Sequence, residues 1–449
     1  MTINSADILQ FRVNESRSQI VDRVHTQILM PTGINIKSFS RLLELLKVLY
    51  NLIQEHENAH CKGIVHRDIS IGNLMIFPLD WDDVANTCGR LMDFDRAKLA
   101  MEFTSPPSHS IPQDRISRYM DYLQDFGLAV DPEAIKLGYM LAEMSTCNYM
   151  RDVIRARGSY FDVVPDGLQW KFAHLGWKSK DAKWPDFSNR KHRQGQRTGT
   201  LPFISSEVLF GTAIFGSAKT VQNSVHDIES FLWVIVHICL THQGPGLGAP
   251  RKELTSSQPE NMQSKALKKI IFDVFENPNG ASLAIEKTVL ITNVDQFVVD
   301  ILPHFHPYFD CLKPMVTQWW ATLRLAYQHE AYEYYHIHSH ILAILQTAIA
   351  DLESPNKPPG YQQDIDDQGY QHEIERRQAL HQEALARFRT LHGMDKKNAD
   401  TMQSTPPASL EESPNRYRQL PASPSTPSPL PFDPSQPSPN RPSKMQRRC

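Results

Sequence analysis

The most constraining feature of this 449-residue chain is a short polar loop between an amphipathic helix and an apolar strand. Apolar residues recur at three- and four-residue steps from Phe39 to Ile53, which predicts a helix with one buried face. The loop then carries H-R-D at 66–68 and Asn73, and the apolar run L-M-I at 74–76 predicts a strand directly after it. A fold that accommodates this order has to present the aspartate and the asparagine on one tight turn.

An aspartate followed five residues later by an asparagine suits the chemistry of phosphoryl transfer. The carboxylate of Asp68 can accept the proton of an attacking hydroxyl, and the amide oxygen of Asn73 can bind a magnesium ion that bridges phosphates. Gly72 lets the backbone turn between them. Further along, Asp93 ends a second apolar strand and can hold another magnesium ion. The alternative for the first motif alone is an accidental H-R-D in a surface turn.

A second D-F-G-like sequence, at 125–127, competes for the metal role. It lies far beyond Asn73 and follows R-Y-M-D-Y-L-Q, which is helical in pattern. A paired-strand hairpin that can present a metal-binding aspartate is predicted at 74–93, so Asp93 is preferred over Asp125.

With these motifs the chain resembles the fungal-type protein kinase domain family, a branch of the protein-kinase-like fold. The sequences that carry the resemblance are G-I-V-H-R-D-I-S-I-G-N-L-M-I from Gly63, M-D-F-D-R-A-K-L-A from Met92, R-T-G-T-L-P-F-I-S from Arg197 and H-D-I-E-S-F from His226. H-R-D-x-x-x-x-N matches the protein-kinase catalytic loop at every fixed position. The resemblance covers roughly residues 23–350.

The resemblance implies ATP and Mg²⁺ as cofactors and suggests roles in phosphoryl transfer. Asp68 would be the catalytic base, together with His66 and Arg67 of the same motif. Thr200 would hydrogen-bond the aspartate through its hydroxyl. The implied ligands of the cofactor and its metal are Asn73 and Asp93.

The resemblance also implies two structural anchors. Segment 199–207 reads G-T-L-P-F-I-S-S-E, and its closing Glu207 would hold the segment by a buried ion pair. Asp227 would hydrogen-bond the catalytic-loop backbone from the start of a strongly apolar helix predicted over 226–240.

The chain departs from the usual protein-kinase pattern. Ser70 stands where a lysine normally helps to neutralise the transferring phosphate, Asp95 replaces the glycine of D-F-G, and Ser206 replaces a proline. About thirty residues precede Pro31, and they hold no glycine-rich loop and no strand with an ATP-binding lysine. We therefore expect an α+β, mainly α fold: a protein-kinase-like C-terminal lobe with a short β-hairpin at the catalytic loop and an incomplete small lobe. Kinase activity is expected to be weak or absent.

Composition shifts along the chain predict four regions. An N-terminal segment (1–22) precedes the kinase-like domain (23–350), which contains an insertion at about 100–195. A linker and an isolated helix follow at 355–395. The tail, 396–449, is rich in Ser and Pro and is predicted to be disordered, because it cannot bury enough apolar surface. Its Ser-Pro and Thr-Pro steps are typical of sites for a proline-directed kinase.

The net charge bears on which partners the chain can bind, and its cysteines bear on the cell compartment. The net charge of −3 gives no reason to expect a nucleic-acid or membrane partner. The resemblance to protein kinases implies a protein substrate or regulatory partner. Six scattered cysteines without a C-x-x-C pair favour a reducing, intracellular location, cytoplasmic or nuclear. The apolar run 231–240 is too short to cross a bilayer and is predicted to be a buried helix. Three histidines at 336, 338 and 340 are interpreted as surface or half-buried residues rather than metal ligands.

Three functions remain open from the sequence. The first is an ATP-dependent protein serine/threonine kinase. The second is a small-molecule phosphotransferase of the aminoglycoside-kinase type, which uses a similar aspartate–asparagine loop. The third is a pseudokinase scaffold that binds partners without catalysis. Segment 197–207 favours the first over the second, because small-molecule kinases generally lack such a peptide platform.

Overall fold

The described part of the chain is mainly helical. The computed structural model describes residues 33–79, 83–100, 102–104, 111–142, 145–158, 169–171, 175, 184–187, 199–214, 220–246, 250–255, 261–293, 295–329 and 336–391. Within them the strands are few and short, which agrees with the predicted α+β, mainly α class. The predicted N-terminal segment 1–22, the strand-like segment 23–30 and the tail 396–449 lie outside the described residues.

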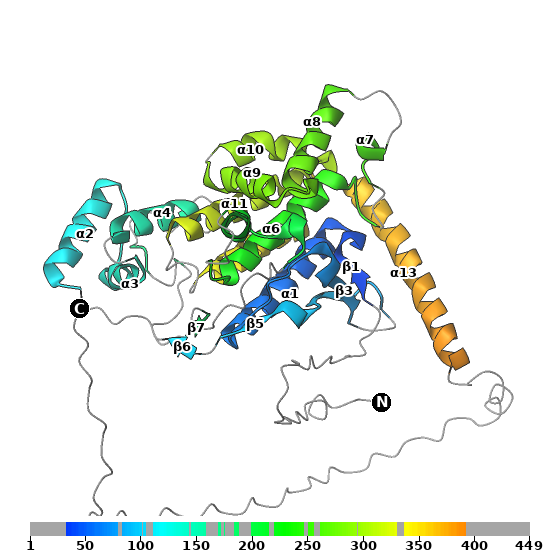
Figure 1. Ribbon diagram of the computed structural model, residues 1–449, viewed down its shortest axis with the longest axis horizontal. Helices are drawn as coiled ribbons and strands as arrows, with labels where there is room; N and C mark the ends of the chain where they lie inside the picture. Colours follow the sequence, from blue (N-terminus) through cyan, green and yellow to red (C-terminus); the bar gives the residue numbers. More distant parts are fainter. Residues whose placement is uncertain are drawn as a thin grey trace, which may run out of the picture. The chain divides into compact units, whose positions relative to one another are not determined.

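In the described chain most strands lie before residue 105, and helices dominate after it (Figure 1). The helices are α1 Leu42–Cys61, α2 Gln113–Asp125, α3 Pro132–Ala142, α4 Thr146–Gly158, α5 Ser206–Ile214, α6 Ser224–Thr241, α7 Lys252–Thr255, α8 Met262–Ile271, α9 Gly280–Thr292, α10 Gln296–Asp300, α11 Lys313–Gln328, α12 Ile337–Glu353 and α13 Gln363–Leu391. The strands are β1 Ile34–Asn35, β2 Ile64–Val65, β3 Leu74–Pro78, β4 Thr87–Leu91, β5 Lys98–Leu99, β6 Glu102–Thr104 and β7 Trp184–Asp186.

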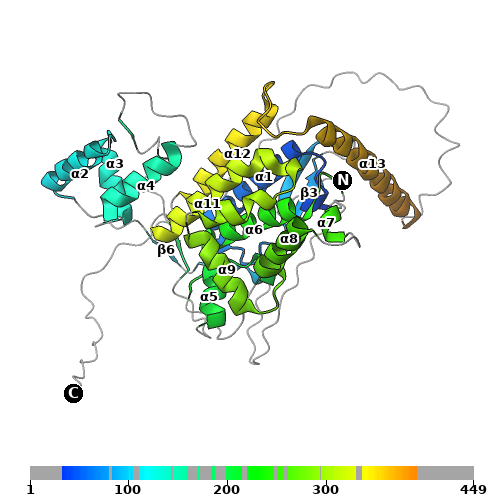
Figure 2. The same cartoon turned by 90° about the horizontal axis from the view of Figure 1, so that it is seen from above.

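Helix α12 joins the central helices of the fold. It contacts α1, α6 and α11, and these helices lie close together in Figure 2. The apolar face predicted for the first helix is buried here: Leu42, Leu46, Leu49 and Ile53 are fully inaccessible to solvent. Burial of each such side chain contributes about 1.5–3 kcal/mol before the entropy of ordering is subtracted, so this face ties the segment before the polar loop to the core.

Helix α6 is buried on all sides, as predicted for its apolar run. A capping box starts it: Asn223 accepts a hydrogen bond from the N–H of Val225, and the His226 ring accepts one from the N–H of Asn223. Its length and composition would suffice to cross a membrane, but 89% of it is buried inside the fold. The apolar character of α6 is therefore explained by its place in the core of the described chain.

A three-stranded antiparallel sheet, in the order β1-β3-β4, flanks the polar loop. In the β3–β4 hairpin, Leu74 pairs with Leu91, so the start of one strand lies beside the end of the other. Gly89 lets this hairpin pack tightly on α1, because a Cβ atom there would lie 2.3 Å from the carbonyl oxygen of Val48. Strands β2 and β5 form a second antiparallel pair, which ties Ile64 to Leu99.

The sequence patterns at 131–157 and at 314–352 each predict one long helix, and the structure divides both. Residues 131–157 form α3 and α4, separated around Ser145. Ser and Thr at 145–146 favour helix starts over helix interiors, which accounts for the break. The helix expected from 314 to 352 is α11 and α12, separated at 329–336.

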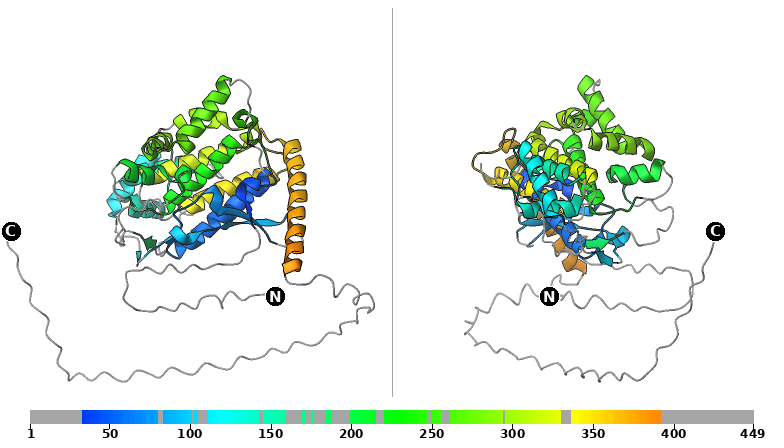
Figure 3. Two further views of the ribbon diagram at one scale, coloured as in Figure 1. Left: turned by 45° about the vertical axis from the view of Figure 1, so that its right-hand side comes forward. Right: turned by 90° about the vertical axis from the view of Figure 1, so that its left-hand side faces the viewer.

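Within the region 355–395, the sequence pattern predicts an isolated helix at 372–392. Both its predicted start and its predicted isolation are wrong. Helix α13 begins at Gln363, and its N-terminal half is anchored to α1. The Asp366 carboxylate accepts a hydrogen bond from the N–H of Leu42, which caps α1 from another part of the chain. Arg377 forms a buried ion pair of 2.7 Å with Glu44. The helix continues beyond these contacts (Figure 3).

Candidate active site

The fold anchors the H-R-D loop through a fully buried carboxylate on α6. Asp227 accepts hydrogen bonds from the backbone N–H of His66 at 2.8 Å and of Arg67 at 3.1 Å. Arg67 has a φ of 71°, in the left-handed region that non-glycine residues rarely adopt. The two backbone bonds to Asp227 help to hold this strained conformation. The expected hydrogen bonds between the loop backbone and Asp227 are therefore present, with the carboxylate as acceptor.

Two histidines extend this anchor into α1 and α12. His56 Nε2 donates to Asp227 at 3.0 Å, since a carboxylate can only accept. The other ring nitrogen of His56 lies 2.8 Å from Nε2 of His338. Burial raises the pKa of Asp227, but hydrogen bonds and charge from His56, with further contributions from His66 and Arg67, outweigh it and keep this pKa below 3.8.

The histidines at 336, 338 and 340 are all buried, so the prediction of surface or half-buried side chains is wrong. His340 donates to the carbonyl oxygen of Leu175. No cluster of three or more His, Cys, Asp or Glu in the described ranges is arranged to hold a metal ion.

The ring of His66 connects the loop to the segment that carries Asp93. Its Nε2 donates to the carbonyl oxygen of Met92 at 2.9 Å, and its Nδ1 accepts from the N–H of Asp68 at 3.3 Å. Burial lowers the pKa of His66, which keeps the ring neutral and fits this donor and acceptor assignment. The ring also packs on Phe94, with ring centroids 4.6 Å apart.

The two carboxylate oxygens of Asp68 have different surroundings. Oδ1 accepts hydrogen bonds from the backbone N–H of Thr200 at 2.8 Å and from its hydroxyl at 2.9 Å. Oδ2 lies 3.4 Å from Nε of Arg96. The side chain is 10% exposed, so one oxygen is held in place while the other faces Arg96.

Asn73 and Met92, the residue before Asp93, lie side by side at one end of the β3–β4 hairpin. The Asn73 amide donates through Nδ2 to the carbonyl oxygen of Asp68 at 2.8 Å, which fixes Nδ2 on the loop and directs Oδ1 away from it. The carbonyl oxygen of Asn73 accepts from the N–H of Met92 at 2.9 Å, so the residue before Asp93 lies beside Asn73. Asp93 has an exposed side chain and a φ of 61°.

These two side chains fit a magnesium ion by the chemistry of their donors. Mg²⁺ prefers oxygen ligands and keeps several waters, so it needs only one or two protein oxygens together with phosphate oxygens. Asn73 offers an amide oxygen, because its amide nitrogen is already committed to the loop. Asp93 offers an exposed carboxylate on the neighbouring chain segment.

Segment 199–207 is pressed against the H-R-D loop. Gly199 has a φ of +115°, and a Cβ atom there would lie 3.2 Å from the carbonyl oxygen of Arg67, so only glycine fits without strain. Lys287 on α9 is fully buried and donates to the carbonyl oxygens of Pro202 at 2.6 Å and Ile204 at 2.9 Å. The segment therefore has a fixed path.

The buried acid that anchors this segment is Glu229, not Glu207. Glu207 forms a 2.9 Å pair with His226, but its side chain is 52% exposed. The hydrogen bond from His226 lowers the pKa of Glu207, although partial burial opposes the shift. Glu229, which is fully buried, accepts from the N–H and hydroxyl of Ser206 and from the hydroxyl of Tyr327. The expectation of a buried ion pair at Glu207 is therefore wrong.

Sequence reasoning missed four side chains that shape the site: His56, Arg96, Glu229 and Lys287. A signal existed for two of them. Glu229 and Lys287 are charged residues inside apolar helical stretches, where a charge is tolerated only with partners. For His56 and Arg96, nothing in the neighbouring sequence indicated that they pair with aspartates.

The competing D-F-G sequence ends a helix. Asp125 is the last residue of α2, and Gly127 adopts a φ of +72° and donates to the carbonyl oxygen of Gln124. This is a helix C-cap, the role that a glycine most often has after a helix. The preference for Asp93 over Asp125 agrees with this placement.

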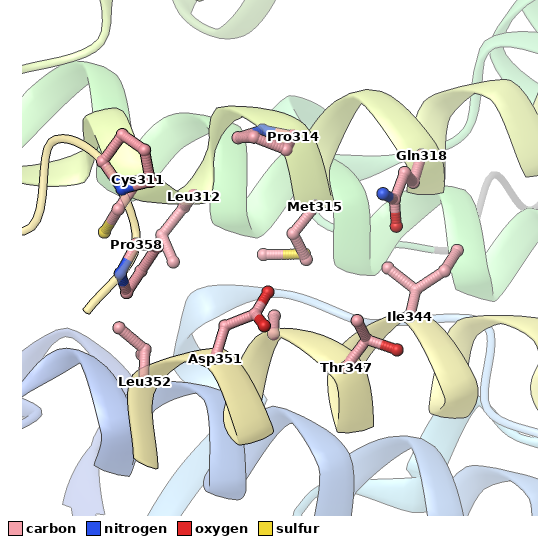
Figure 4. Close-up of a pocket in the computed structure, with 12 residues that line it drawn as sticks. Cys311, Leu312, Pro314, Met315, Gln318, Ile344, Thr347, Asp351, Leu352 and Pro358 are labelled. Carbon is pink, nitrogen blue, oxygen red and sulfur yellow. The ribbon is translucent and has the colours of Figure 1, made fainter. Parts of the chain in front are cut away.

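A small pocket lies away from these residues. It is formed between α11, α12 and the segment after α12, and Asp351 and Met315 project into it (Figure 4). Its lining is mostly apolar and includes none of the residues of the H-R-D loop or its partners.

Comparison with known proteins agrees with the resemblance seen in the sequence. Residues 5–114 and 182–239 match the family described as fungal protein kinase. The first match contains the H-R-D loop and Asp93, and the second contains segment 199–207 and Asp227. No curated protein and no solved structure gave a significant match. The residues that build the site lie within the two segments that match the fungal protein kinase family.

Proposed function

We propose that this chain transfers a phosphoryl group from ATP to a serine or threonine hydroxyl of a protein, with Asp68 as catalytic base. The observation that carries the proposal is the asymmetry of the Asp68 carboxylate. Thr200 engages Oδ1 through two hydrogen bonds and fixes the side chain. Oδ2 is then the oxygen that can receive a proton from a substrate hydroxyl.

In the proposed step one bond to phosphorus forms, another breaks, and one proton moves to Asp68. The substrate hydroxyl oxygen forms a bond to the γ-phosphorus, the bond from this phosphorus to the bridging oxygen of ADP breaks, and the hydroxyl proton passes to Oδ2 of Asp68. Asn73 and Asp93 would hold magnesium, which when bound offsets negative charge on the phosphates. Asp227 keeps the loop backbone in the orientation that the step requires.

A protein substrate is favoured over a small molecule by segment 199–207. Lys287 and Glu229 fix this segment from α9 and α6, and Gly199 brings it against the H-R-D loop. A rigid backbone beside the catalytic base can support an extended peptide. A small-molecule phosphotransferase of the aminoglycoside-kinase type remains the second candidate, and it would not need this surface.

We further propose that transfer by this chain alone is slow. Ser70 is 4% exposed and uncharged, where serine/threonine kinases usually carry a lysine near the transferring phosphate. A pseudokinase scaffold that engages a regulatory partner is the non-catalytic alternative. An intracellular location, cytoplasmic or nuclear, and phosphorylation of the tail by a proline-directed kinase belong to this proposal as well.

The test compares substitutions at three aspartates, two of which precede a phenylalanine. The full chain is incubated with labelled ATP, magnesium and a generic protein substrate, and label transfer is measured for wild type, Asp68→Asn, Asp93→Asn and Asp125→Asn. We expect slow transfer that is lost in the first two variants and retained in Asp125→Asn, because Asp125 ends a helix.

Each other outcome identifies a different function. If ATP with magnesium does not bind, the scaffold alternative replaces the proposal. Transfer to an aminoglycoside but not to protein would favour the small-molecule phosphotransferase. Transfer that persists in Asp68→Asn would exclude this residue as the base.

A further inference from the structure

Two positively charged side chains in or beside the H-R-D loop, among the residues that the structure describes, are already bound to other groups. Arg67 directs its Nε to Gln222 at 3.0 Å. Lys98 is buried, and its Nζ donates to the carbonyl oxygen of Phe187. Arg96 differs from both, because its side chain is 49% exposed and contacts Asp68.

The position of Arg96 is fixed by the strands on either side of it. The β3–β4 hairpin ends at Leu91, and β5 begins at Lys98 and pairs with β2, directly before the H-R-D sequence. Between them, a 3₁₀ turn spans Phe94–Arg96, closed by a hydrogen bond from the N–H of Ala97 to Phe94. The backbone of this turn therefore holds Arg96 three residues after Asp93, independently of the contact that its side chain makes with Asp68.

The contact between Arg96 and Asp68 is loose. The distance of 3.4 Å from Nε to Oδ2 exceeds the 2.7–2.9 Å that is typical of strong charge-assisted hydrogen bonds. Because the guanidinium is half-exposed, breaking this contact to form a stronger one costs little free energy. A phosphate is the better partner, because the planar guanidinium can bind it through two N–H groups at once.

We infer that Arg96 binds the γ-phosphate of ATP and supplies the positive charge that Ser70 cannot. This inference rests on the proposed function and names a further residue of the same site. Without nucleotide, Arg96 contacts Oδ2 of Asp68. With nucleotide, the guanidinium turns to the γ-phosphate, which frees Oδ2 for the substrate hydroxyl and offsets charge on the phosphoryl group during transfer.

The test measures nucleotide binding separately from catalysis. The full chain is titrated into ATP with magnesium and into ADP with magnesium, and the ³¹P NMR resonances report weak as well as tight binding. We expect Arg96→Gln to weaken ATP binding roughly tenfold, as for loss of a charge-assisted hydrogen bond, and to leave ADP binding unchanged. Arg96→Lys should retain most of the affinity for ATP.

Arg90 provides the matched control. Its side chain is 46% exposed, against 49% for Arg96, and it pairs with Glu55 rather than with a residue of the site. Arg90→Gln should bind both nucleotides as wild type does. Equal ATP binding by wild type and Arg96→Gln would overturn the role of Arg96 and leave the proposed function standing. A wild-type chain that binds neither nucleotide would overturn both, and equal weakening for ATP and ADP would exclude contact with the γ-phosphate.

Discussion

Thr200 donates both its backbone N–H and its hydroxyl to the same oxygen of Asp68, across 132 positions of sequence. The two bonds, of 2.8 and 2.9 Å, join the H-R-D loop to segment 199–207. Gly199 makes the approach possible, because a side chain in its place would press on the backbone of Arg67. The orientation of the catalytic base in this chain therefore depends on a distant segment.

The first prediction concerns the hydroxyl of this pair. Thr200→Val keeps the backbone bond and the shape of the side chain but removes one donor to Asp68. We expect phosphoryl transfer to fall roughly tenfold, which corresponds to about 1.4 kcal/mol for a bond to a charged group. The side chain of Thr200 is exposed, so the thermal unfolding temperature should change little.

Thr200→Ser is the control for this measurement, because serine retains the hydroxyl. Initial rates at saturating ATP and magnesium compare the two variants, and hydrogen exchange at residues 199–205 reports whether the segment loosens. Identical rates in the serine and valine variants would show that the hydroxyl does not orient Asp68.

The second prediction concerns stability in acid. Burial raises the pKa of Glu44, but the hydrogen bond and charge of Arg377, with hydrogen bonds from Thr87 and Ser40, outweigh it, and the net pKa lies below 4.5. The pKa of Asp227 likewise lies below 3.8. Both groups take up protons in the unfolded chain before they do so in the folded chain, so their contribution is complete above about pH 4.5 and is lost as the pH falls through the folded values.

Urea unfolding at intervals from pH 7 to pH 3 measures this loss. We expect a stability plateau near neutral pH, a steep fall below about pH 4.5, and a shallower fall in Glu44→Gln and Asp227→Asn, which are already less stable at pH 7. Asp114→Asn is the control, because the Asp114 side chain is 65% exposed and its pair is a surface pair. Parallel acid slopes in wild type and both buried variants would contradict the assignment.

The third prediction concerns the attachment of α13. Arg377 donates to Glu44, to Glu373 and to the carbonyl oxygen of Ser38, and all four groups are buried. Arg377→Leu leaves the two carboxylates without this partner, which should cost about 3–5 kcal/mol, as when one member of a buried ion pair is removed. The loss appears as a lower unfolding temperature and as faster hydrogen exchange along Gln363–Arg377.

Arg387→Gln is the matched control on the same helix. Its pair with Glu383 is a surface pair, with the arginine side chain 75% exposed, so removal should cost less than about 0.5 kcal/mol. A double-mutant cycle between Glu44 and Arg377 isolates the pair itself. If Arg377→Leu were as stable as Arg387→Gln, the helix would not be held by this contact.

The sequence alone was sufficient for the local part of the site. The helix before the loop, the strand after it and the order of Asp68, Asn73 and Asp93 follow from short-range periodicity and spacing. Short spacing limits the geometry strongly, since a few residues of turn between paired elements allow few backbone paths. The family match over 5–114 and 182–239 agrees with that interpretation.

Only the tertiary structure decided which distant charges are paired. Glu229 rather than Glu207 became the buried anchor, Arg96 came to face Asp68, and Arg377 reached Glu44 from the C-terminal helix. Each of these contacts joins segments that are separated in the sequence. The packing of helices and strands determines which residues meet. A charged residue inside an apolar stretch signals that some partner exists, but the desolvation cost that demands the partner does not say which residue supplies it.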